Sequence, residues 1–300
     1  MCGIVGLFLK DKALEPQLGA MLSDMLITMT DRGPDSAGIA IYGAPSPGRA
    51  KLTVQSARPA TDFAGLEQAL GEAGIPAQVT VKSTHAVVDL PLGELDAARA
   101  FVVARGLRVM GAGESVEIFK EVGLPKEVVA RFDIRAMGGS HGIGHTRMAT
   151  ESAVTTLGAH PFSTGADQCL VHNGSLSNHN NLRRELVKAG MAFETQNDSE
   201  VAAAYLTAEM AAGKDLGQAL EGALGDLDGF FTFVVGTRTG FGVVRDPIAC
   251  KPAVMAETDQ YIAFGSEYRA LVNLPGIETA RVWEPEPATV YFWDHGKVAA

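Results

Sequence analysis

Apolar residues recur along this chain with two different periods, and the period changes from one segment to the next. Residues 4–9 form an unbroken apolar run with β-branched members, which predicts a strand that is buried on both faces. Over residues 15–29 the apolar positions recur every three or four residues, as they do along one side of a helix. These positions are Leu18, Met21, Leu22, Met25, Leu26 and Met29. A core-facing helix is therefore expected after the first strand.

The predicted helix ends at residues 31–38, which are rich in turn formers and carry charges of both signs. A short second strand is expected over residues 38–42. The Pro, Gly and Ser residues of positions 43–48 then indicate a connector.

Residues 50–113 have an element order of their own, β-α-β-β-α-β, which is the split-βαβ or ferredoxin-like arrangement. The expected strands and helices are 51–56, 61–71, 78–82, 85–90, 94–104 and 107–110. We therefore predict an inserted subdomain over residues 50–113. Two short helices, 114–122 and 125–132, are expected to follow, so that residues 114–137 form a helical linker.

The second half of the chain alternates between strand and helix patterns. A strand that includes residues 169–176 is followed by helices over 180–189 and 200–211. Further strands are predicted at 229–236, 240–245, 252–256, 260–265 and 289–293, with a short helix at 266–274. Groups of strands separated by helices predict sheets whose outer faces are covered by helices.

Composition narrows the class of protein. The 300 residues are 46% hydrophobic and 20% charged, which is ordinary for a folded chain of one large domain or two modest ones. A formal net charge of -10 argues against nucleic acid as a partner, because nucleic-acid binders present clustered Lys and Arg. Three cysteines are an odd and sparse set for a disulfide framework, so we expect a reducing compartment, the cytoplasm.

The apolar start of the chain is interrupted by charged residues at positions 10–12 and has no basic leader. It is therefore too short for a signal-peptide core or a membrane helix, and no later window reaches about 18 apolar residues. No membrane partner is expected.

Cys2 is the candidate nucleophile. If Met1 is removed, as is expected when a small side chain follows it, Cys2 carries both a thiol and a free α-amine. A free thiol titrates near ~8.5 and a terminal amine near ~7.7–8.0, so the amine can accept the thiol proton without a separate histidine. The alternative is that Cys2 is a small apolar residue at the start of a buried strand.

Two His and Cys spacings superficially suggest metal ligands. His141 and His145 would face one another on a helix, but four glycines between positions 138 and 144 make a helix implausible there. Cys169 and His172 lie in a predicted strand with no second such pair. We therefore predict no metal site.

Five short motifs occur in series: Cys2-Gly3-Ile4-Val5-Gly6, Arg32-Gly33-Pro34-Asp35-Ser36, Gly144-His145-Thr146-Arg147, His172-Asn173-Gly174 and Asp198-Ser199-Glu200. In this order they resemble the class II glutamine amidotransferases, the family whose nucleophile is the N-terminal residue. The resemblance covers residues 1 to about 50 and about 140 to 300. It implies an α+β fold, a four-layer α/β/β/α sandwich of antiparallel sheets, over residues 1–300, with the subdomain inserted into it.

The resemblance also implies roles for individual residues. The Cys2 sulfur would attack the side-chain amide of glutamine, with the Asn173 side chain and the Gly174 N–H as the oxyanion hole. Arg147 would bind the α-carboxylate of glutamine, and Asp198 would bind its α-ammonium group. A zwitterionic head group needs one partner of each sign.

Further residues are expected around this pocket. Four are expected to line it: His145, Thr146, Thr150 and His172. Two Arg–Asp pairs are expected to hold the nucleophile's loops rather than to touch the substrate: Arg32 with Asp35, and Arg245 with Asp246.

Three positions depart from the pattern of the better-known branches of the family. Met148 stands where many members have an aromatic residue, Glu151 where the aminosugar synthases have histidine, and Cys250 at a usual glycine. These differences argue against the aminosugar and purine branches and leave the four principal roles unaffected.

Taken as a whole, the sequence is most similar to the amidotransferase-like subunit of glutamate-synthase-like complexes, in particular N-methylglutamate synthase of methylamine metabolism. That resemblance implies no cofactor in this chain, with FMN or an iron–sulfur cluster in the partner subunits. The glutaminase pattern and its insertion together account for all 300 residues, so the site that accepts ammonia is expected on a partner polypeptide. The insertion is a candidate for docking that partner.

Two other functions stay open. The chain could be a catalytically silent structural subunit of such a complex. It could also be an N-terminal-nucleophile hydrolase of another amide, such as a penicillin or a bile-salt conjugate. Arg147 together with Asp198 disfavours the second, because those substrates lack a free amino-acid head group.

Overall fold

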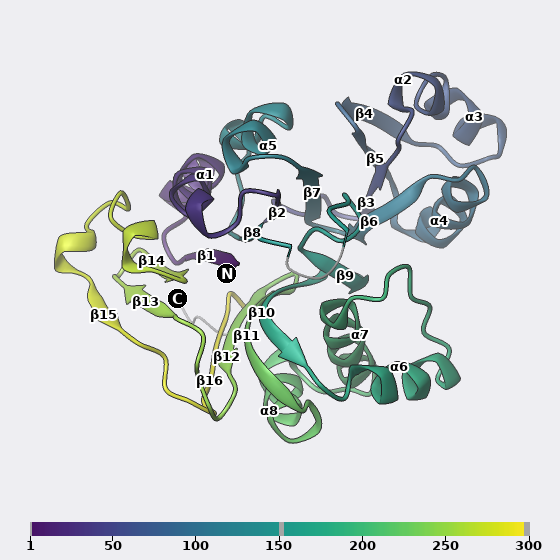
Figure 1. Cartoon of the computed structure of the whole chain (residues 1–300). Coiled ribbons are helices and arrows are strands. Elements are labelled where there is room, and N and C mark those ends of the chain that lie inside the picture. The colour runs from purple at the N-terminus through teal and green to yellow at the C-terminus, as the bar shows by residue number, and fades with distance from the viewer. Residues whose placement is uncertain (1, 150–152, 297–300) are drawn as a thin grey trace.

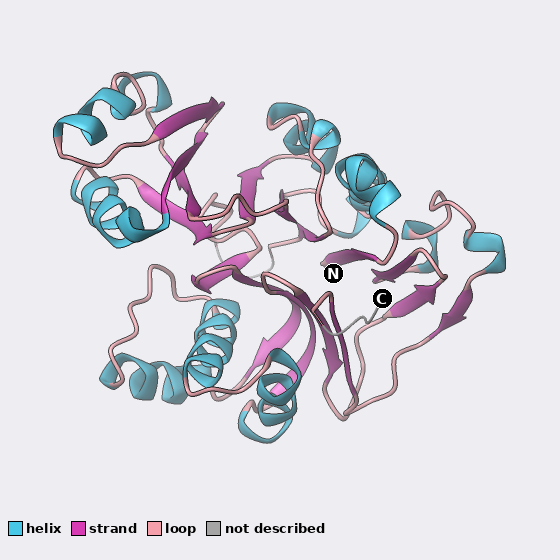
Figure 2. Cartoon of the chain, turned by 180° about the vertical axis from the view of Figure 1, so that it is seen from behind, coloured by secondary structure: helices cyan, strands magenta, loops and turns pink. Residues whose placement is uncertain are grey.

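The computed structural model of the chain describes residues 2–149 and 153–296. The main body has four layers, in which a seven-stranded and a five-stranded sheet lie face to face between two layers of helices (Figures 1 and 2). Every strand pair in these sheets is antiparallel. The α/β/β/α sandwich expected from the sequence is confirmed.

The seven-stranded sheet has the order β15-β13-β14-β1-β8-β2-β7. Its strands are β1 Gly3–Leu9, β2 Ser36–Tyr42, β7 Val116–Val122, β8 His141–Arg147, β13 Val254–Glu257, β14 Tyr261–Gly265 and β15 Arg281–Trp283. Helices α1 (Leu18–Thr28) and α5 (Pro125–Arg131) cover its outer face, together with the short 3-10 turns η1 Lys12–Gln17, η2 Thr30–Arg32, η4 Ile134–Ala136, η5 Tyr268–Ala270 and η6 Ile277–Thr279.

The five-stranded sheet has the order β16-β12-β11-β10-β9. Its strands are β9 Phe162–Gly165, β10 Gln168–Leu176, β11 Gly229–Gly236, β12 Gly240–Arg245 and β16 Val290–Asp294. Three helices cover its outer face: α6 His179–Lys188, α7 Asp198–Ala211 and α8 Leu216–Asp226. None of the helices in the described ranges is long and apolar enough to cross a membrane.

Strand β1 shows why the first apolar run is unbroken. Val5 and Leu7 pack against α1, whereas Ile4 and Phe8 pack into the core between the two sheets. Gly6 faces the same inter-sheet core, where a Cβ would lie only 2.8 Å from the Phe241 ring. The strand is therefore buried on both faces, and the glycine lets the two sheets approach at its centre.

The insertion forms a four-stranded antiparallel sheet of order β4-β5-β3-β6 with helices on one face. Its elements are β3 Arg49–Gln55, α2 Pro59–Asp62, α3 Leu66–Glu72, β4 Gln78–Lys82, β5 His85–Pro91, η3 Leu92–Glu94, α4 Leu95–Ala104 and β6 Arg108–Gly113. This is the strand order of a ferredoxin-like fold. The whole unit is placed between β2 and β7, which pair with each other, so it projects from the edge of the seven-stranded sheet (Figure 1).

Residues 114–122 are not a helix, and the prediction of a purely helical linker is wrong. They contain β7, which pairs with β2 from Ser36↔Val122 to Tyr42↔Val116. Val116 and Ile118 face the inter-sheet core and Phe119 faces the opposite side, so the segment has the period of two of a strand. Helix α5 lies where the second linker helix was expected. The prediction also omitted β8, β9, β15 and α8.

Candidate active site

One cleft of about 910 Å³ brings together residues that are far apart in the sequence. Cys2, Arg147, Asn173, Gly174 and Asp198 all line it. They come from the start of β1, the end of β8, the middle of β10 and the first residue of α7. Both sheets of the sandwich therefore contribute to this cleft.

Cys2 is held through its backbone. Its carbonyl oxygen accepts a hydrogen bond from Arg32 Nε at 3.0 Å and another from Asn173 Nδ2 at 3.3 Å. The next residue, Gly3, pairs with Thr146, and a Cβ on Gly3 would lie 2.7 Å from the Thr146 hydroxyl. The start of β1 is thus fixed against β8, and the Asn173 amide lies beside Cys2.

Arg32 and Asp35 act on the chain segments around Cys2 and do not line the cleft. Arg32 Nη1 lies 2.5 Å from Glu267 Oε1, and this hydrogen bond lowers the pKa of Glu267. Asp35 Oδ2 accepts a hydrogen bond from the Ala149 N–H at 2.8 Å, and its own N–H donates to the Arg147 carbonyl. Both residues therefore fix backbone on either side of the cleft.

Gly174 has a backbone conformation that favours glycine. Its φ is +155°, and a Cβ at this position would lie 2.0 Å from the Phe230 carbonyl oxygen. Because no side chain intervenes, the backbone of Gly174 lies at the cleft beside the Asn173 amide.

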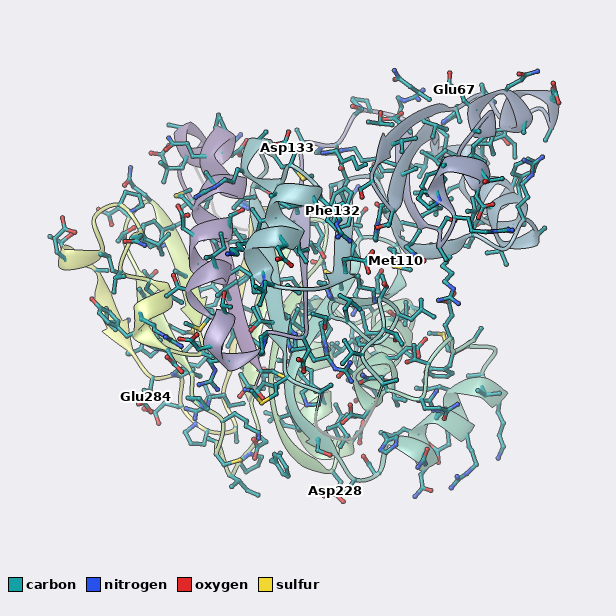
Figure 3. The ribbon with its side chains drawn as sticks, turned by 45° about the horizontal axis from the view of Figure 1, so that its top comes forward. Glu67, Met110, Phe132, Asp133, Asp228 and Glu284 are labelled. Carbon is teal, nitrogen blue, oxygen red and sulfur yellow. The ribbon has the colours of Figure 1, made fainter. Side chains whose placement is uncertain are left out.

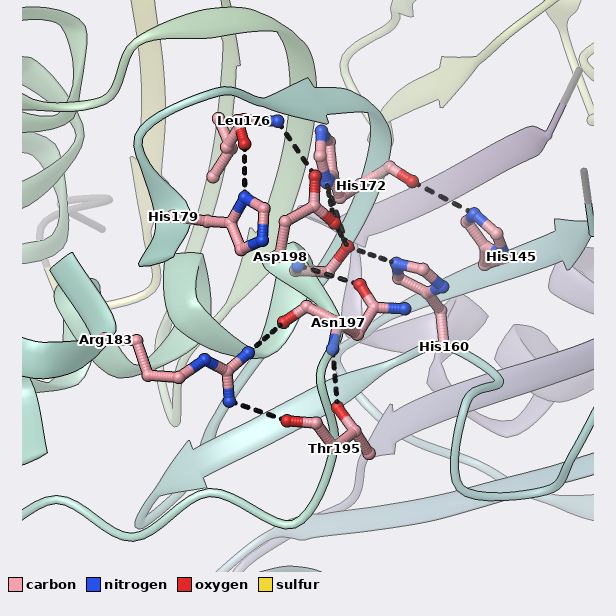
Figure 4. Close-up of polar contacts among 10 residues, drawn as sticks. His145, His160, His172, Leu176, His179, Arg183, Thr195, Asn197 and Asp198 are labelled. Atoms are coloured by element: carbon pink, nitrogen blue, oxygen red, sulfur yellow. Dashed lines mark hydrogen bonds and ion pairs between the residues drawn. The ribbon is translucent and has the colours of Figure 1, made fainter. Parts of the chain in front are cut away.

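Asp198 is tied to β10 by one of its two oxygens. Oδ2 accepts a hydrogen bond from the Leu176 N–H at 2.9 Å (Figure 4). The neighbouring Asn197 caps α7 by accepting the Ser199 N–H, which fixes the first turn of the helix. The Asp198 side chain is still 22% exposed, so it presents a carboxylate to the cleft.

Arg147 lies at the end of β8 and is 7% exposed. Its Nη1 donates to the Ala153 carbonyl at 3.3 Å. A guanidinium is planar and can bind a carboxylate through two parallel N–H groups.

Three buried imidazoles and one serine form a network at the cleft wall (Figure 4). The Ser199 hydroxyl lies 2.9 Å from His160 Nε2 and 2.9 Å from His172 Nδ1. The rings of His145 and His160 stack with their centroids 4.0 Å apart. His145 Nε2 donates to the His172 carbonyl at 3.1 Å. Ser199 therefore links α7 to β10 and to the loop that carries His160.

Burial keeps these imidazoles neutral. Burial lowers the pKa of His145 to about 3, although the hydrogen bond to the His172 carbonyl opposes this shift. It also lowers the pKa of His160 well below its usual value. Burial lowers the pKa of His172 as well, and outweighs the opposing effect of the Asp198 carboxylate. At neutral pH the network therefore orients groups and adds no positive charge.

Comparisons with known proteins decide the family. The chain is 79% identical over 301 residues to the glutamine amidotransferase-like protein GlxB of Rhizobium meliloti (strain 1021), with 100% of both chains covered. It is 33% identical to a putative glutamine amidotransferase of Methanothermobacter thermautotrophicus, over 98% of this chain and 100% of that one. The chain belongs to the class II glutamine amidotransferase family. The family described as "Glutamine amidotransferase domain" also matches residues 145–273.

A solved structure of the family supports the fold. Glutamine phosphoribosylpyrophosphate (PRPP) amidotransferase from B. subtilis, complexed with ADP and GMP, superposes with a TM-score of 0.63 at 19% identity. The match covers 98% of this chain and 48% of that one. The likeness concerns the fold alone.

Two of the expected pocket residues of this amidotransferase do not line the cleft. His145 is fully buried behind it, and Thr146 donates its hydroxyl to the Met29 carbonyl at 3.2 Å. Both lie on β8, whose successive side chains point to opposite faces of the sheet, so His145 stacks on His160 and Thr146 points towards Met29. Their predicted contact with substrate is therefore corrected to a supporting position. Thr150 lies outside the described residues, and His172 does line the cleft.

Arg245 and Asp246 hold a loop at the rim of the cleft. Arg245 Nη2 donates to the Lys251 carbonyl at 2.8 Å, and Asp246 Oδ1 accepts the Phe231 N–H at 2.9 Å. Lys251 lines the cleft with its Nζ 4.8 Å from the centroid of the Phe230 ring. Arg245 and Asp246 therefore act on the cleft indirectly, through the loop that carries Lys251 and through β11 next to Phe230.

Sequence reasoning missed His160, Ser199, Phe230 and Lys251 as cleft residues. Ser199 had a local signal, because it follows Asp198 at a helix start, but that signal indicates only capping. The other three follow no periodic pattern and come from loops or a strand end. Only the folded chain places them together.

Proposed function

We propose that this amidotransferase is a glutaminase subunit, which hydrolyses glutamine at Cys2 and releases ammonia for a synthase partner. The observation that carries the proposal is the hydrogen bond from Asn173 Nδ2 to the Cys2 carbonyl, in a cleft that Arg147 and Asp198 also line. A nucleophile, a hydrogen-bond donor beside it and two charges of opposite sign are the groups that the hydrolysis of a free amino-acid amide needs.

The proposed reaction begins with attack of the Cys2 sulfur on the side-chain carbonyl carbon of glutamine. The thiol proton passes to the α-amine of the same residue. The negative charge on the carbonyl oxygen is stabilised by the Asn173 amide and the Gly174 N–H. The amine then gives the proton to the departing nitrogen, so that ammonia leaves and a thioester forms. Water attacks the thioester, glutamate leaves and the thiol is restored.

The charged residues of the cleft would hold the head group of glutamine. The Arg147 guanidinium pairs with the α-carboxylate and the Asp198 carboxylate with the α-ammonium group. The neutral network around Ser199 favours this arrangement, because it places no second positive charge next to Asp198. An amide without an amino-acid head group would offer neither a carboxylate to Arg147 nor an ammonium group to Asp198.

We further propose that the chain works within a heteromeric, glutamate-synthase-like complex, such as N-methylglutamate synthase. FMN, or an iron–sulfur cluster, would belong to the partner subunits. The support is the resemblance of the whole sequence to the amidotransferase-like subunit of such complexes. The inserted subdomain supports it further, because it projects from the edge of the sandwich and has a core of its own. Co-purification of the native complex with its flavin would test this part.

The glutaminase activity is tested by measuring glutamate release from glutamine by the purified chain. Cys2→Ala should reduce release to the uncatalysed background, whereas Cys250→Ala, at an exposed cysteine, should leave it unchanged. Intact mass should show that Met1 is absent. Release that persists in Cys2→Ala contradicts the mechanism. A complex whose turnover does not depend on Cys2 would instead identify a structural subunit.

A further inference from the structure

Two neighbouring residues of β7 hold the segment 153–161, which we call the cleft loop. Ala153, Thr155, Leu157, Gly158 and His160 of this loop line the cleft. Strand β7 follows the insertion in the chain and is the edge strand of the seven-stranded sheet. The residues of β7 therefore lie between the insertion and the active site.

Glu121 bonds to both of these regions. Its Oε2 accepts the hydroxyl of Thr84 at 2.8 Å, and Thr84 lies in the turn between β4 and β5 of the insertion. Its Oε1 accepts the hydroxyl of Thr156 in the cleft loop and the N–H of Val122. The carboxylate is buried, with Arg131 Nη1 3.7 Å away. One buried carboxylate thus joins the insertion to the cleft loop.

Lys120 holds the same loop from the opposite face of β7. Its Nζ donates to the carbonyls of Leu157 at 3.3 Å, Ala159 at 2.8 Å and Pro161 at 3.1 Å. Burial lowers the pKa of Lys120 to about 8. The cleft loop is therefore fixed to β7 at four points, and Glu121 is the one that also reaches the insertion.

The cleft loop in turn positions the proposed substrate groups. The carbonyl of Ala153 accepts from Arg147 Nη1 at 3.3 Å, and a Cβ on Gly158 would lie 3.4 Å from the same nitrogen. His160 hydrogen-bonds to Ser199, next to Asp198. A shift of the loop would therefore move the guanidinium. Cys2 and Asn173 come from other elements and would stay in place.

We propose that Glu121 is a positioning residue for glutamine, which couples the position of the inserted subdomain to the cleft loop and so to Arg147. The kinetic part of this inference rests on the proposed glutaminase function. Because the loop acts on the head-group site, loss of the coupling should raise KM more than it lowers kcat. Docking of a partner on the insertion would then affect the active site through the buried carboxylate of Glu121.

Replacing Glu121 itself would leave the hydroxyls of Thr84 and Thr156 and the N–H of Val122 without this acceptor, which would destabilise the fold. The test therefore removes each hydroxyl in turn. Thr84→Val and Thr156→Val should each raise the KM for glutamine about three- to tenfold and leave kcat within about twofold. Thr84→Ser and Thr156→Ser, which keep the hydroxyl, should restore the KM. Thr80→Val, at an exposed position of β4, is the matched control and should have no effect.

The double variant distinguishes coupling from two separate structural defects. If Glu121 connects the two hydroxyls, the KM of the double variant should resemble that of either single variant. If the fold-increases in KM of the two single variants multiply in the double variant, the proposal is overturned. An unchanged KM in Thr84→Val would also overturn it.

A second readout does not depend on activity. Amide hydrogen exchange over residues 153–161 should be faster in Thr84→Val than in Thr80→Val, because the loop loses part of its anchorage. Faster exchange in a chain that does not hydrolyse glutamine would support the coupling and refute the glutaminase. Unchanged exchange in an active enzyme would refute the coupling alone.

Discussion

The core of the insertion and the wall of the cleft are both buried, yet their chemistry differs. The insertion packs apolar side chains between one sheet face and its helices, among them Leu52, Val54, Leu66 and Val88. Figure 3 labels Glu67, next to Leu66, at the outer end of this unit. At the cleft the buried positions include His145, His160, His172 and Ser199. Burying such polar groups is costly unless they are hydrogen-bonded.

This difference separates the residues that fold the chain from those that place its reacting groups. The apolar core of the insertion stabilises by burial alone and tolerates exchange of one apolar side chain for another of similar volume. The network at the cleft is held by directional hydrogen bonds of 2.9 to 3.1 Å. Its contribution is therefore to fix the positions of side chains at the cleft. Substitutions in the two regions should therefore have different signatures.

The largest effect is expected at the cleft. Asn173→Ala should lower kcat for glutamine hydrolysis by about 10²–10³, because the developing oxyanion loses one donor. The free energy of unfolding should change far less than this loss of activity suggests. Asn181→Ala, at an exposed asparagine of α6, is the control. An equal fall of kcat in both variants would contradict the role of Asn173 as an oxyanion donor.

The second effect is expected in the insertion. Leu66→Ala should lower the free energy of unfolding by about 2–5 kcal/mol, because Leu66 is fully buried and the substitution leaves a cavity. The kcat of the folded protein should stay near that of the wild type. Urea denaturation and steady-state kinetics measure the two quantities. Leu66→Met should cost less than about 1.5 kcal/mol. If Leu66→Ala lowered kcat as much as Asn173→Ala does, the distinction between the insertion core and the cleft would be contradicted.

The last effect is gradual and concerns pH. Burial lowers the folded-state pKa of His145, His141 and His85 to about 3, so the unfolded chain binds protons below pH ~6.5 that the folded chain does not. The free energy of unfolding should therefore fall as pH drops from about 6.5 towards 5, by up to about 1.4 kcal/mol per pH unit for each histidine. Urea denaturation at several pH values measures it. Stability that rises over this range would contradict the neutral network.

Local sequence identified most of the elements, and the exceptions have a physical reason. Residues 116–122 mix Lys and Glu, which are common in helices, with Val, Ile and Phe, which favour strands, so the segment considered alone is ambiguous. Pairing with β2 satisfies their backbone groups as a strand and turns Lys120 and Glu121 to opposite faces. Tertiary pairing therefore decided an element that also carries the proposed coupling.

The sequence by itself determined the alternation of buried faces, the position of the insertion and the residues that resemble a glutamine amidotransferase. These features follow from periodicity and from the order of motifs along the chain. Only the tertiary structure showed that His145 and Thr146 lie behind the cleft, and that Ser199, His160 and Lys251 belong to it. The reason is that the cleft is formed by segments that are scattered along the chain, from Cys2 to Lys251. No local pattern encodes which of their side chains meet.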